Sequence, residues 1–295
     1  MAERTLGIVG GSGLYDLPGL EDVERVSLET PFGEPSDSFV VGRLEETRVV
    51  FISRHGRGHR LMPSEINYRA NVWGLKKLGC ERVISVTAVG SMREDVAPGD
   101  MLIVDQFFDR TRGRPSTFFG DGLVAHVVLA DPVCDDLGSV IETAARETGA
   151  GVHRGGTYLC IEGPCFSTRA ESRIFRQWGV DVIGMTNLPE ARLAREAELC
   201  YGVLAMVTDF DCWHDTEEDV CTQGVLAVMG RNVERAKKIV RDVAAGLPAG
   251  RGCSCGSALD GAIITHPSAI SGEARERLDL LVGRYLEEES STAAG

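Results

Sequence analysis

Side chains that can donate hydrogen bonds to an anion recur in short polar stretches of this sequence. Together with backbone N–H groups of glycine-containing loops, the candidates are Ser12, Arg54, His55, Thr87, Ala88 and Thr186. Arginine offers paired planar donors, and histidine offers a proton that it can give or take. A pocket built from these groups would be rich in donors and poor in acceptors, as a phosphate dianion requires. The residues therefore predict a phosphate site with no metal ion and no Walker-type lysine loop.

Each stretch also has an ordinary structural interpretation. Residues 10–13 suit a tight turn, and they form no dinucleotide fingerprint because Asp16 stands where its third glycine would be. The basic run at 54–60 could be a solvated loop. Thr186 comes just before an expected helix start, where free N–H groups and the helix dipole favour an anion. The phosphate interpretation depends on the combination of these stretches.

Two carboxylic acids flank an aromatic residue in the segment Thr208-Asp209-Phe210-Asp211. In an extended segment both acids lie on the same side. A protonated Asp209 beside an ionised Asp211 would match adenine, whose N7/N6 edge presents an acceptor beside an amino donor. A 6-oxopurine would set acceptor against acceptor at Asp211. Turn formation or helix capping is the alternative for such a pair, and Phe166 could either stack on a base or join the core.

Apolar, β-branched runs that alternate with helical patterns must position these groups. Strands are expected at 4–9, 39–44, 48–53, 82–89, 100–105, 156–162, 181–184 and 201–208. Helices are expected from a Ser64 cap to Gly79, after a Thr168–Glu171 capping box, over 191–199 behind an Asn187 cap, over 217–245 and over 272–289. This alternation predicts an α/β fold with helices on both faces of a sheet.

Six polar loops follow directly after predicted strands. In open α/β sheets, ligands bind outside the carboxyl ends of the strands. We therefore expect the loops that begin near Gly10, Arg54, Thr87, Glu162, Met185 and Asp209 to converge on one edge of the sheet. This convergence is the central prediction, because it would join the anion-binding donors and the acid pair in a single site.

Composition narrows the classes of partner. The chain has 295 residues and a formal net charge of −13, so its surface repels nucleic acid and anionic membranes. No apolar run approaches the roughly 18 residues that span a bilayer, and the N-terminus has no secretory pattern. We expect a cytoplasmic protein that binds small molecules, not nucleic acid or membranes.

Nine cysteines are too sparse for a disulfide framework. Cys80, Cys134, Cys160 and Cys200 lie in apolar surroundings and are expected to be small core residues. The pair in Cys253-Ser-Cys255 could form a strained disulfide, act as a redox pair, bind a metal weakly or remain as free thiols, which we favour. Without a second pair at ligand spacing, we expect no zinc site.

Six motifs resemble, in order and spacing, the 5′-methylthioadenosine phosphorylases of the trimeric purine nucleoside phosphorylase class. They are GGSGLYD, SRHGRGH, TAVGSM, EGPCFSTRAES, GMTNLPEARLAREAELCY and TDFDCWH, between Gly7 and Val225. The resemblance implies one domain over 1–295 with a three-layer phosphorylase/hydrolase-like fold, a central mixed sheet flanked by helices, and a C-terminal CxC segment and helix over about 247–295. It implies phosphorolysis of 5′-methylthioadenosine, with adenosine as an alternative substrate, to adenine and 5-methylthioribose 1-phosphate in purine and methionine salvage. No cofactor is implied, because inorganic phosphate is a co-substrate.

The resemblance also implies roles for individual residues. Phosphate would be bound by Ser12, Arg54, His55, Thr87, Ala88 and Thr186, and the nucleoside by Met185, Asp209, Phe210, Asp211 and Phe166. Asp209 and His55 would be catalytic, and Ser167, Thr222 and Val225 would tune specificity. His126 would reach a neighbouring subunit of a homotrimer or a dimer of trimers.

Three other functions remain open at this point. A close relative could cleave 6-oxopurine nucleosides or methylthioinosine. Arg54-His55-Gly56 is the core motif of histidine phosphatases, for which His214-Asp215 could be the distal pair. The same pocket could also belong to a nucleoside-binding protein without catalytic activity.

Overall fold

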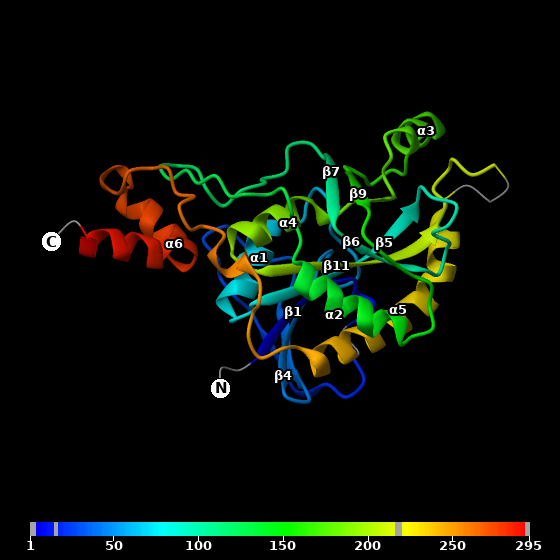
Figure 1. Cartoon of the computed structure of the whole chain (residues 1–295), viewed down its shortest axis with the longest axis horizontal. Coiled ribbons are helices and arrows are strands. Elements are labelled where there is room, and N and C mark those ends of the chain that lie inside the picture. Colours follow the sequence, from blue (N-terminus) through cyan, green and yellow to red (C-terminus); the bar gives the residue numbers. More distant parts are fainter. Residues whose placement is uncertain (1–3, 15–16, 216–219, 293–295) are drawn as a thin grey trace.

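A mixed β-sheet forms the centre of the computed structural model, which describes residues 4–14, 17–215 and 220–292 (Figure 1). Within those residues the sheet has eleven strands: β1 (Arg4–Gly10), β2 (Glu21–Val26), β3 (Phe39–Leu44), β4 (Thr47–Ser53), β5 (Arg82–Ser91), β6 (Met101–Val104), β7 (Gln106–Arg110), β8 (Val152–Arg154), β9 (Thr157–Ile161), β10 (Val182–Gly184) and β11 (Cys200–Asp209). The main path runs β2-β3-β4-β1-β5-β10-β9-β7, while β11 pairs with β5 and β6, and β8 pairs with β6. Strand β5 is therefore the hub, because β1, β10 and β11 all pair with it.

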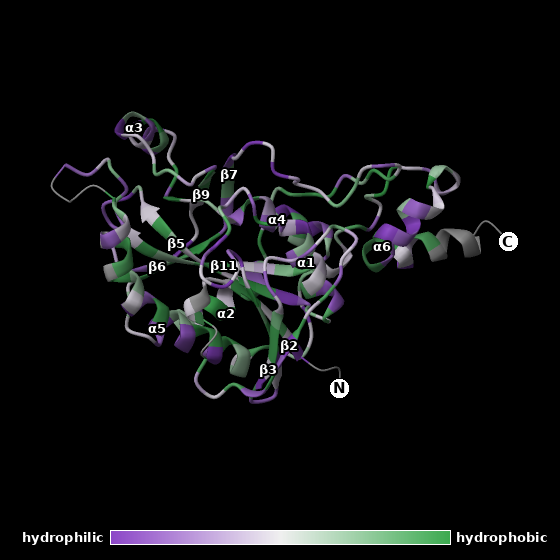
Figure 2. Cartoon of the chain, turned by 180° about the vertical axis from the view of Figure 1, so that it is seen from behind, coloured by the Kyte–Doolittle hydropathy of each residue, from purple (hydrophilic) through white to green (hydrophobic). Residues whose placement is uncertain are grey.

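The described helices are α1 (Tyr68–Lys77), α2 (Asp135–Arg146), α3 (Arg169–Gln177), α4 (Asn187–Glu196), α5 (Thr222–Gly246) and α6 (Gly272–Thr292). Four of them cover the two faces of the sheet, while α3 and α6 lie to its sides (Figure 1). Helices α1 and α4 pack together on one face, and α2 and α5 on the other (Figure 1). Each pair buries its own apolar cluster, with Leu75 and Leu193 in one and Ile141 and Ile239 in the other. The strands between the helices are predominantly hydrophobic (Figure 2). The predicted three-layer α/β fold with a mixed sheet is confirmed.

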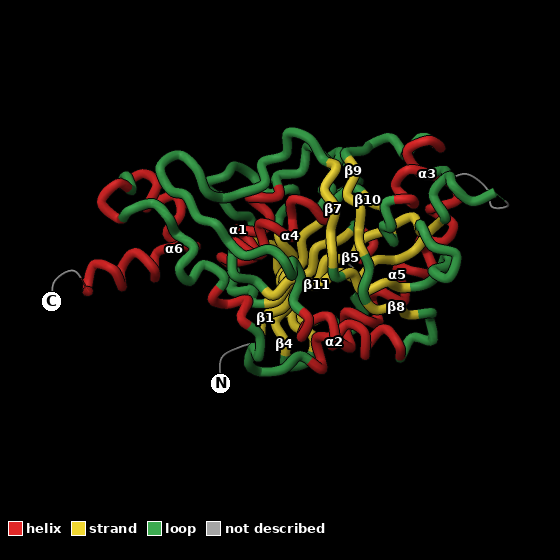
Figure 3. The backbone as a smooth tube through the Cα atoms, turned by 45° about the horizontal axis from the view of Figure 1, so that its top comes forward, coloured by secondary structure: helices red, strands yellow, loops and turns green. Residues whose placement is uncertain are grey.

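A long connection between β7 and α2 lies along one side of the molecule and reaches α6 (Figure 3). Phe118 and Leu123 of this connection share an apolar cluster with Leu278 and Leu281 of α6. The C-terminal segment also forms an isolated bridge to the connection, between Ala125 and Ile263. The C-terminal CxC segment and helix, expected over about 247–295, are thus packed onto the body through this connection.

The eight predicted strands are all present, with ends shifted by a few residues at most. Three further strands lacked a sequence signal, and one helix was not predicted although its apolar residues recur at helical spacing. Strand β2 is mostly exposed and charged, β7 alternates weakly, and β8 has only three residues. Helix α2 begins after Cys134, which makes no side-chain capping bond, so no capping residue announced it. The predicted start of the 217–245 helix lies outside the described residues, and α5 begins at Thr222.

Two predicted helix caps are wrong and one is confirmed. Asn67, rather than Ser64, caps α1, accepting a hydrogen bond from the Ala70 N–H at 3.1 Å. Asn187 is buried in α4, where its amide donates to Ser85 and Tyr201 instead of capping the helix. The Thr168–Glu171 capping box opens α3 as predicted.

Candidate active site

A cavity of about 380 Å³ lies where β5, β10 and β11 meet, within the size range of small-molecule sites. All six polar stretches contribute to its lining, so their predicted convergence is confirmed, but Thr87 and Ala88 lie within β5 and not in a loop after it. One residue from each loop, in chain order, is Gly11, His55, Thr87, Phe166, Thr186 and Asp209.

The route by which the loops converge differs from the prediction. Strands β1, β4, β5 and β11 are parallel, so their carboxyl ends share one edge. Strand β10 is antiparallel to β5, and β9 is parallel to β10. The loops after β9 and β10 therefore approach from the opposite direction and meet the others beside Gly90 in β5. The site lies between two opposed sets of strand ends instead of at a single edge.

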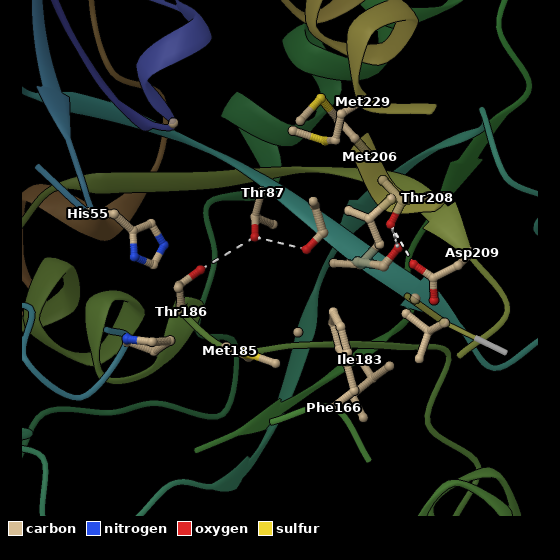
Figure 4. A pocket seen from close by; sticks show the side chains of 18 of the residues that line it. His55, Thr87, Phe166, Ile183, Met185, Thr186, Met206, Thr208, Asp209 and Met229 are labelled. Atoms are coloured by element: carbon tan, nitrogen blue, oxygen red, sulfur yellow. Dashed lines mark hydrogen bonds between the residues drawn. The ribbon is translucent and has the colours of Figure 1, made fainter. Parts of the chain in front are cut away.

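Hydroxyl groups gather at one end of the cavity (Figure 4). The Thr87 and Thr186 Oγ1 atoms are 3.4 Å apart, and His55 lies beside them (Figure 4). Thr186 is the N-cap of α4, yet its side chain makes no capping bond. The sequence predicted that free N–H groups and the dipole at the start of α4 would favour an anion. This contribution to anion binding is reduced, because Leu188 has extended backbone angles and interrupts the first turn. The hydroxyls, more than the helix dipole, equip this end to bind an anion.

His55 is a neutral ring in this environment. Its Nδ1 lies 2.9 Å from the Leu61 carbonyl oxygen, which can only accept, so Nδ1 carries the proton and Nε2 the lone pair. Burial, aided by the positive charge of Arg54, lowers the pKa of His55 to about 4. The ring also stacks on His59 with centroids 4.1 Å apart. At neutral pH His55 therefore offers an acceptor to the cavity, which is one of the two roles that the sequence left open for it.

Arg54 is held in a buried network that the sequence did not predict. Its guanidinium donates to both carboxylate oxygens of Glu190, at 2.9 and 3.1 Å, and to Ser85 Oγ. Ser85 and Tyr201 donate to the same carboxylate at 2.8 Å each. In the sequence, Glu190 was only an acid in the first turn of a predicted helix. The network fixes Arg54 in the cavity wall and balances its charge.

The acid pair occupies another part of the cavity wall. Strands β11 and β5 pair in regular register as far as Val207 opposite Val89, and the next pair is Asp209 opposite Gly90. The register therefore shifts by one residue of β11 just before Asp209, as in a β-bulge. Asp209 accepts from the Thr208 hydroxyl at 2.7 Å and from the Asp211 N–H at 2.8 Å. Burial raises the pKa of Asp209, and burial together with the neighbouring charge of Asp209 raises that of Asp211. The shift is in the direction that general-acid chemistry requires, and the hydrogen bonds that Asp209 accepts act against it.

Apolar side chains close the space between the two polar ends. Met185, Ile183 and Phe166 lie on one side, and Met206 and Met229 on the other (Figure 4). Val225 and Val233 of α5 add to the lining. The Ser167 hydroxyl is buried beside the cavity with no hydrogen-bond partner among the described residues, so a ligand could supply one.

Arg114 positions the two loops that carry Met185 and Phe166, and the sequence had given no sign of it. It is 8% exposed and donates to three backbone carbonyls, those of Met185, Leu188 and Glu162, at 2.7 to 2.9 Å. Because Arg114 comes from the connection between β7 and α2, that connection supports the cavity from behind.

Two residues predicted to line the site, Phe210 and Thr222, are absent from the described cavity lining, as is His126, which was predicted to act at a neighbouring subunit. Phe210 packs against Trp213 and His214, with ring centroids 5.8 and 4.8 Å away, instead of facing a substrate. Thr222 is exposed at the start of α5, and His126 is exposed on the connection between β7 and α2. The side chain of Ser12 lies outside the described residues. Arg54, His55, Thr87, Ala88, Phe166, Ser167, Met185, Thr186, Asp209, Asp211 and Val225 all reach the cavity.

Fold and site together define a class: an α/β protein whose cavity joins a hydroxyl-lined end to a buried acid pair across an apolar slot. The Phosphorylase superfamily model matches residues 5–245. The S-methyl-5′-thioadenosine phosphorylases of Geobacter sulfurreducens and Koribacter versatilis are 58% and 53% identical to the chain, covering 96% and 99% of it and all of each relative.

Solved structures agree with these relatives. A methylthioadenosine phosphorylase from an antarctic soil metagenomic library has a TM-score of 0.90 at 45% identity, covering 95% of this chain and 99% of that one. The Schistosoma mansoni methylthioadenosine phosphorylase in complex with adenine has a TM-score of 0.82 at 39% identity, covering 88% and 96%. The chain belongs to the methylthioadenosine phosphorylase family of the phosphorylase superfamily. Among its described helices, none is long and apolar enough to cross a membrane.

Proposed function

We propose that this protein cleaves 5′-methylthioadenosine with inorganic phosphate to give adenine and 5-methylthioribose 1-phosphate. A phosphate oxygen forms the new bond to the anomeric carbon as the bond from that carbon to purine N9 breaks. The electron pair leaves with the purine, which takes up a proton. The observation that carries the proposal is geometric: the buried acid Asp209 lines the same cavity as the Thr87–Thr186 hydroxyls, and burial raises its pKa.

At the anion-binding end, the hydroxyls of Thr87 and Thr186 would donate hydrogen bonds to phosphate. The Ala88 backbone N–H and the Ser12 hydroxyl would be further donors. Hydrogen phosphate carries one O–H at neutral pH, and the lone pair on His55 Nε2 would accept it. The bound anion would then stabilise the positive charge that develops on the sugar in an oxocarbenium-like transition state. Arg54 would contribute charge from the wall, with its geometry set by Glu190.

At the purine end, Asp209 would donate a proton or hydrogen bond to N7, and Asp211 would accept from the 6-amino group. Phe166 would contact the base, and Met185 would lie against the ribose. The apolar slot that includes Val225 and Met229 suits a methylthio group, because burying it there removes apolar surface from water. A 5′-hydroxyl would gain less in this slot, so adenosine would be the poorer substrate, with Ser167 and Thr222 tuning the difference.

The reaction would serve purine and methionine salvage in the cytoplasm, since it recovers adenine and a sugar that retains the methylthio group. A reducing compartment would also preserve the thiols of a nine-cysteine chain. The active assembly would be a homotrimer or a dimer of trimers. His126 would complete a neighbouring subunit's site, and its exposure on the long connection supports that role.

Adenine release from 5′-methylthioadenosine, measured with and without phosphate, tests the proposal. We expect release that depends on phosphate, with one 5-methylthioribose 1-phosphate formed per adenine. Equal release without phosphate would indicate a hydrolase, and faster turnover of inosine or methylthioinosine would indicate a 6-oxopurine enzyme. Binding without turnover would indicate a nucleoside-binding protein, and hydrolysis of a phosphate monoester alone would indicate a phosphatase.

A further inference from the structure

Four cysteines that are far apart in the sequence gather at one place in the fold. They are Cys134, Cys200, Cys253 and Cys255, and their sulfur atoms all lie within 4.8 Å of one another. The closest measured pair, Cys200 and Cys253, has its sulfurs 3.3 Å apart. Three of the four residues are buried and Cys253 is half-buried. Among the described residues, this cluster is the one group of three or more metal-ligating side chains whose donor atoms converge so closely.

Separate elements bring these thiols together. Cys134 is the N-cap of α2, and Cys200 is the first residue of β11. Cys253 and Cys255 belong to the segment between α5 and α6. Asp209 is the last residue of β11, so the cluster and the acid pair lie at opposite ends of that strand. The sequence argument against zinc assumed that no second ligand pair exists, and Cys134 with Cys200 supplies that pair in space.

We propose that these four cysteines bind a single Zn²⁺ ion as a structural site. Four thiols would release four protons and bind the ion as thiolates in a tetrahedron. With Zn–S bonds of about 2.3 Å, the sulfurs of such a tetrahedron are about 3.8 Å apart, so small side-chain movements suffice. Four sulfurs also leave no coordination position for water, which is typical of structural rather than catalytic zinc.

The common centre distinguishes a metal site from disulfides. Two disulfides would need two close pairs, with no requirement that the pairs approach each other. A single tetrahedral ion requires every sulfur to lie near every other, which is the arrangement found here. A polynuclear iron–sulfur cluster fits less well, because its thiolates bind different iron atoms and are held further apart.

Nearby charges suit an anionic zinc–thiolate centre, which carries a net charge of −2. Arg195 donates from Nη1 to Cys255 Sγ at 3.7 Å. Arg82 and Arg251 line a hollow that Cys134, Cys200 and Cys253 also line, together with one acid, Asp136. Glu81 also lies 3.8 Å from Arg82 and 3.7 Å from Arg251, so three arginines against two carboxylates leave this surrounding net positive.

A metal ion here would clamp the C-terminal segment to the body of the molecule. Cys253 and Cys255 precede the bridge between Ile263 and Ala125, which joins this segment to the connection that carries Arg114 and His126. Fixing the segment at the cysteines would therefore also support that connection. The proposed role is stability, because the ion would lie far from the reacting atoms.

Zinc analysis of the full-length protein, purified and kept under a strong thiol-free reductant, tests the proposal. We expect one zinc per chain by mass spectrometry of the metal, and at least a tenfold loss in the double variant Cys253→Ser, Cys255→Ser. Cys165→Ser is the matched control, because Cys165 is exposed on a different segment and should leave the zinc content unchanged.

A second measurement guards against a variant that fails to fold. The reduced wild-type protein, stripped of metal by a chelator and given Co²⁺, should show the thiolate-to-cobalt charge-transfer band and the visible bands of tetrahedral cobalt. Less than about 0.1 zinc per chain after supplying Zn²⁺ to the reduced wild type would overturn the proposal. So would a cobalt spectrum without thiolate bands, zinc retained by the double variant, or an intact mass showing two disulfides that resist the reductant.

Discussion

Replacing Glu190 with glutamine would remove the charge that balances Arg54 while preserving the shape of the side chain. The two side chains are 2% and 3% exposed, so water cannot compensate. The new amide nitrogen would face donors, because every hydrogen bond to this carboxylate comes from an N–H or O–H group. At least one charge-assisted bond is lost whichever way the amide is oriented.

The expected cost follows from the burial of the pair. Removing one partner of a buried ion pair destabilises proteins by roughly 3 to 5 kcal/mol, mainly because the other charge is left uncompensated. Phosphate would offset part of this loss. A dianion at the Thr87–Thr186 hydroxyls would lie close to the buried Arg54 guanidinium, whose charge the substitution leaves uncompensated. Glu190→Gln should therefore gain more stability from added phosphate than the wild type does.

Urea unfolding followed by far-ultraviolet circular dichroism, in a phosphate-free buffer, measures the free energy of unfolding. The control is Glu142→Gln, which breaks the Glu142–Arg146 pair within one helix, where Arg146 is 58% exposed. We expect this control to cost less than about 0.5 kcal/mol. A loss below about 1 kcal/mol in Glu190→Gln would refute the claim that the network holds Arg54 by charge balance.

Four further outcomes follow from the site. Asp209→Asn, which cannot supply a proton, should lower kcat by about 10²- to 10⁴-fold with an unchanged circular dichroism spectrum, and near-normal turnover would remove Asp209 from the acid role. Asp211→Asn should lower kcat/KM for adenine nucleosides relative to kcat/KM for 6-oxopurine nucleosides. An unchanged ratio would contradict the proposal that Asp211 accepts a hydrogen bond from the 6-amino group. Gly90→Ala should lower kcat/KM more than the melting temperature, because the added methyl group would lie 2.8 Å from the Asp209 carboxylate; equal activity would show that the loop moves aside freely. Neutral His55 contributes stability above its unfolded pKa of 6.5 that is lost as the pH falls toward 4, since only the unfolded chain is protonated in this window. The stability gap between wild type and His55→Gln should therefore narrow over that range, and a constant gap in urea titrations would contradict a lowered pKa.

Much of the fold and of the candidate site could be predicted from local sequence patterns. Strand positions, the Thr168 capping box and the polar stretch after each strand depend on residues close in the sequence, so they could be predicted. The predictions that Ser64 and Asn187 cap helices were wrong. Several residues in each region could cap a helix, and contacts with distant segments determine which one does. The Asn187 side chain instead donates hydrogen bonds to Ser85 in β5 and Tyr201 in β11.

By itself, the sequence determined which chemistry the chain can assemble: hydroxyl and amide donors for an anion, two acids for a purine, and their order after successive strands. Only the tertiary structure decided how these groups behave. It set β10 antiparallel to β5, paired Arg54 with Glu190 across 136 residues and buried His55 as a neutral ring. It also gathered four cysteines from separate elements. Pairing, burial and charge balance are properties of segments distant in the chain, and no local pattern of residues encodes which of them will meet.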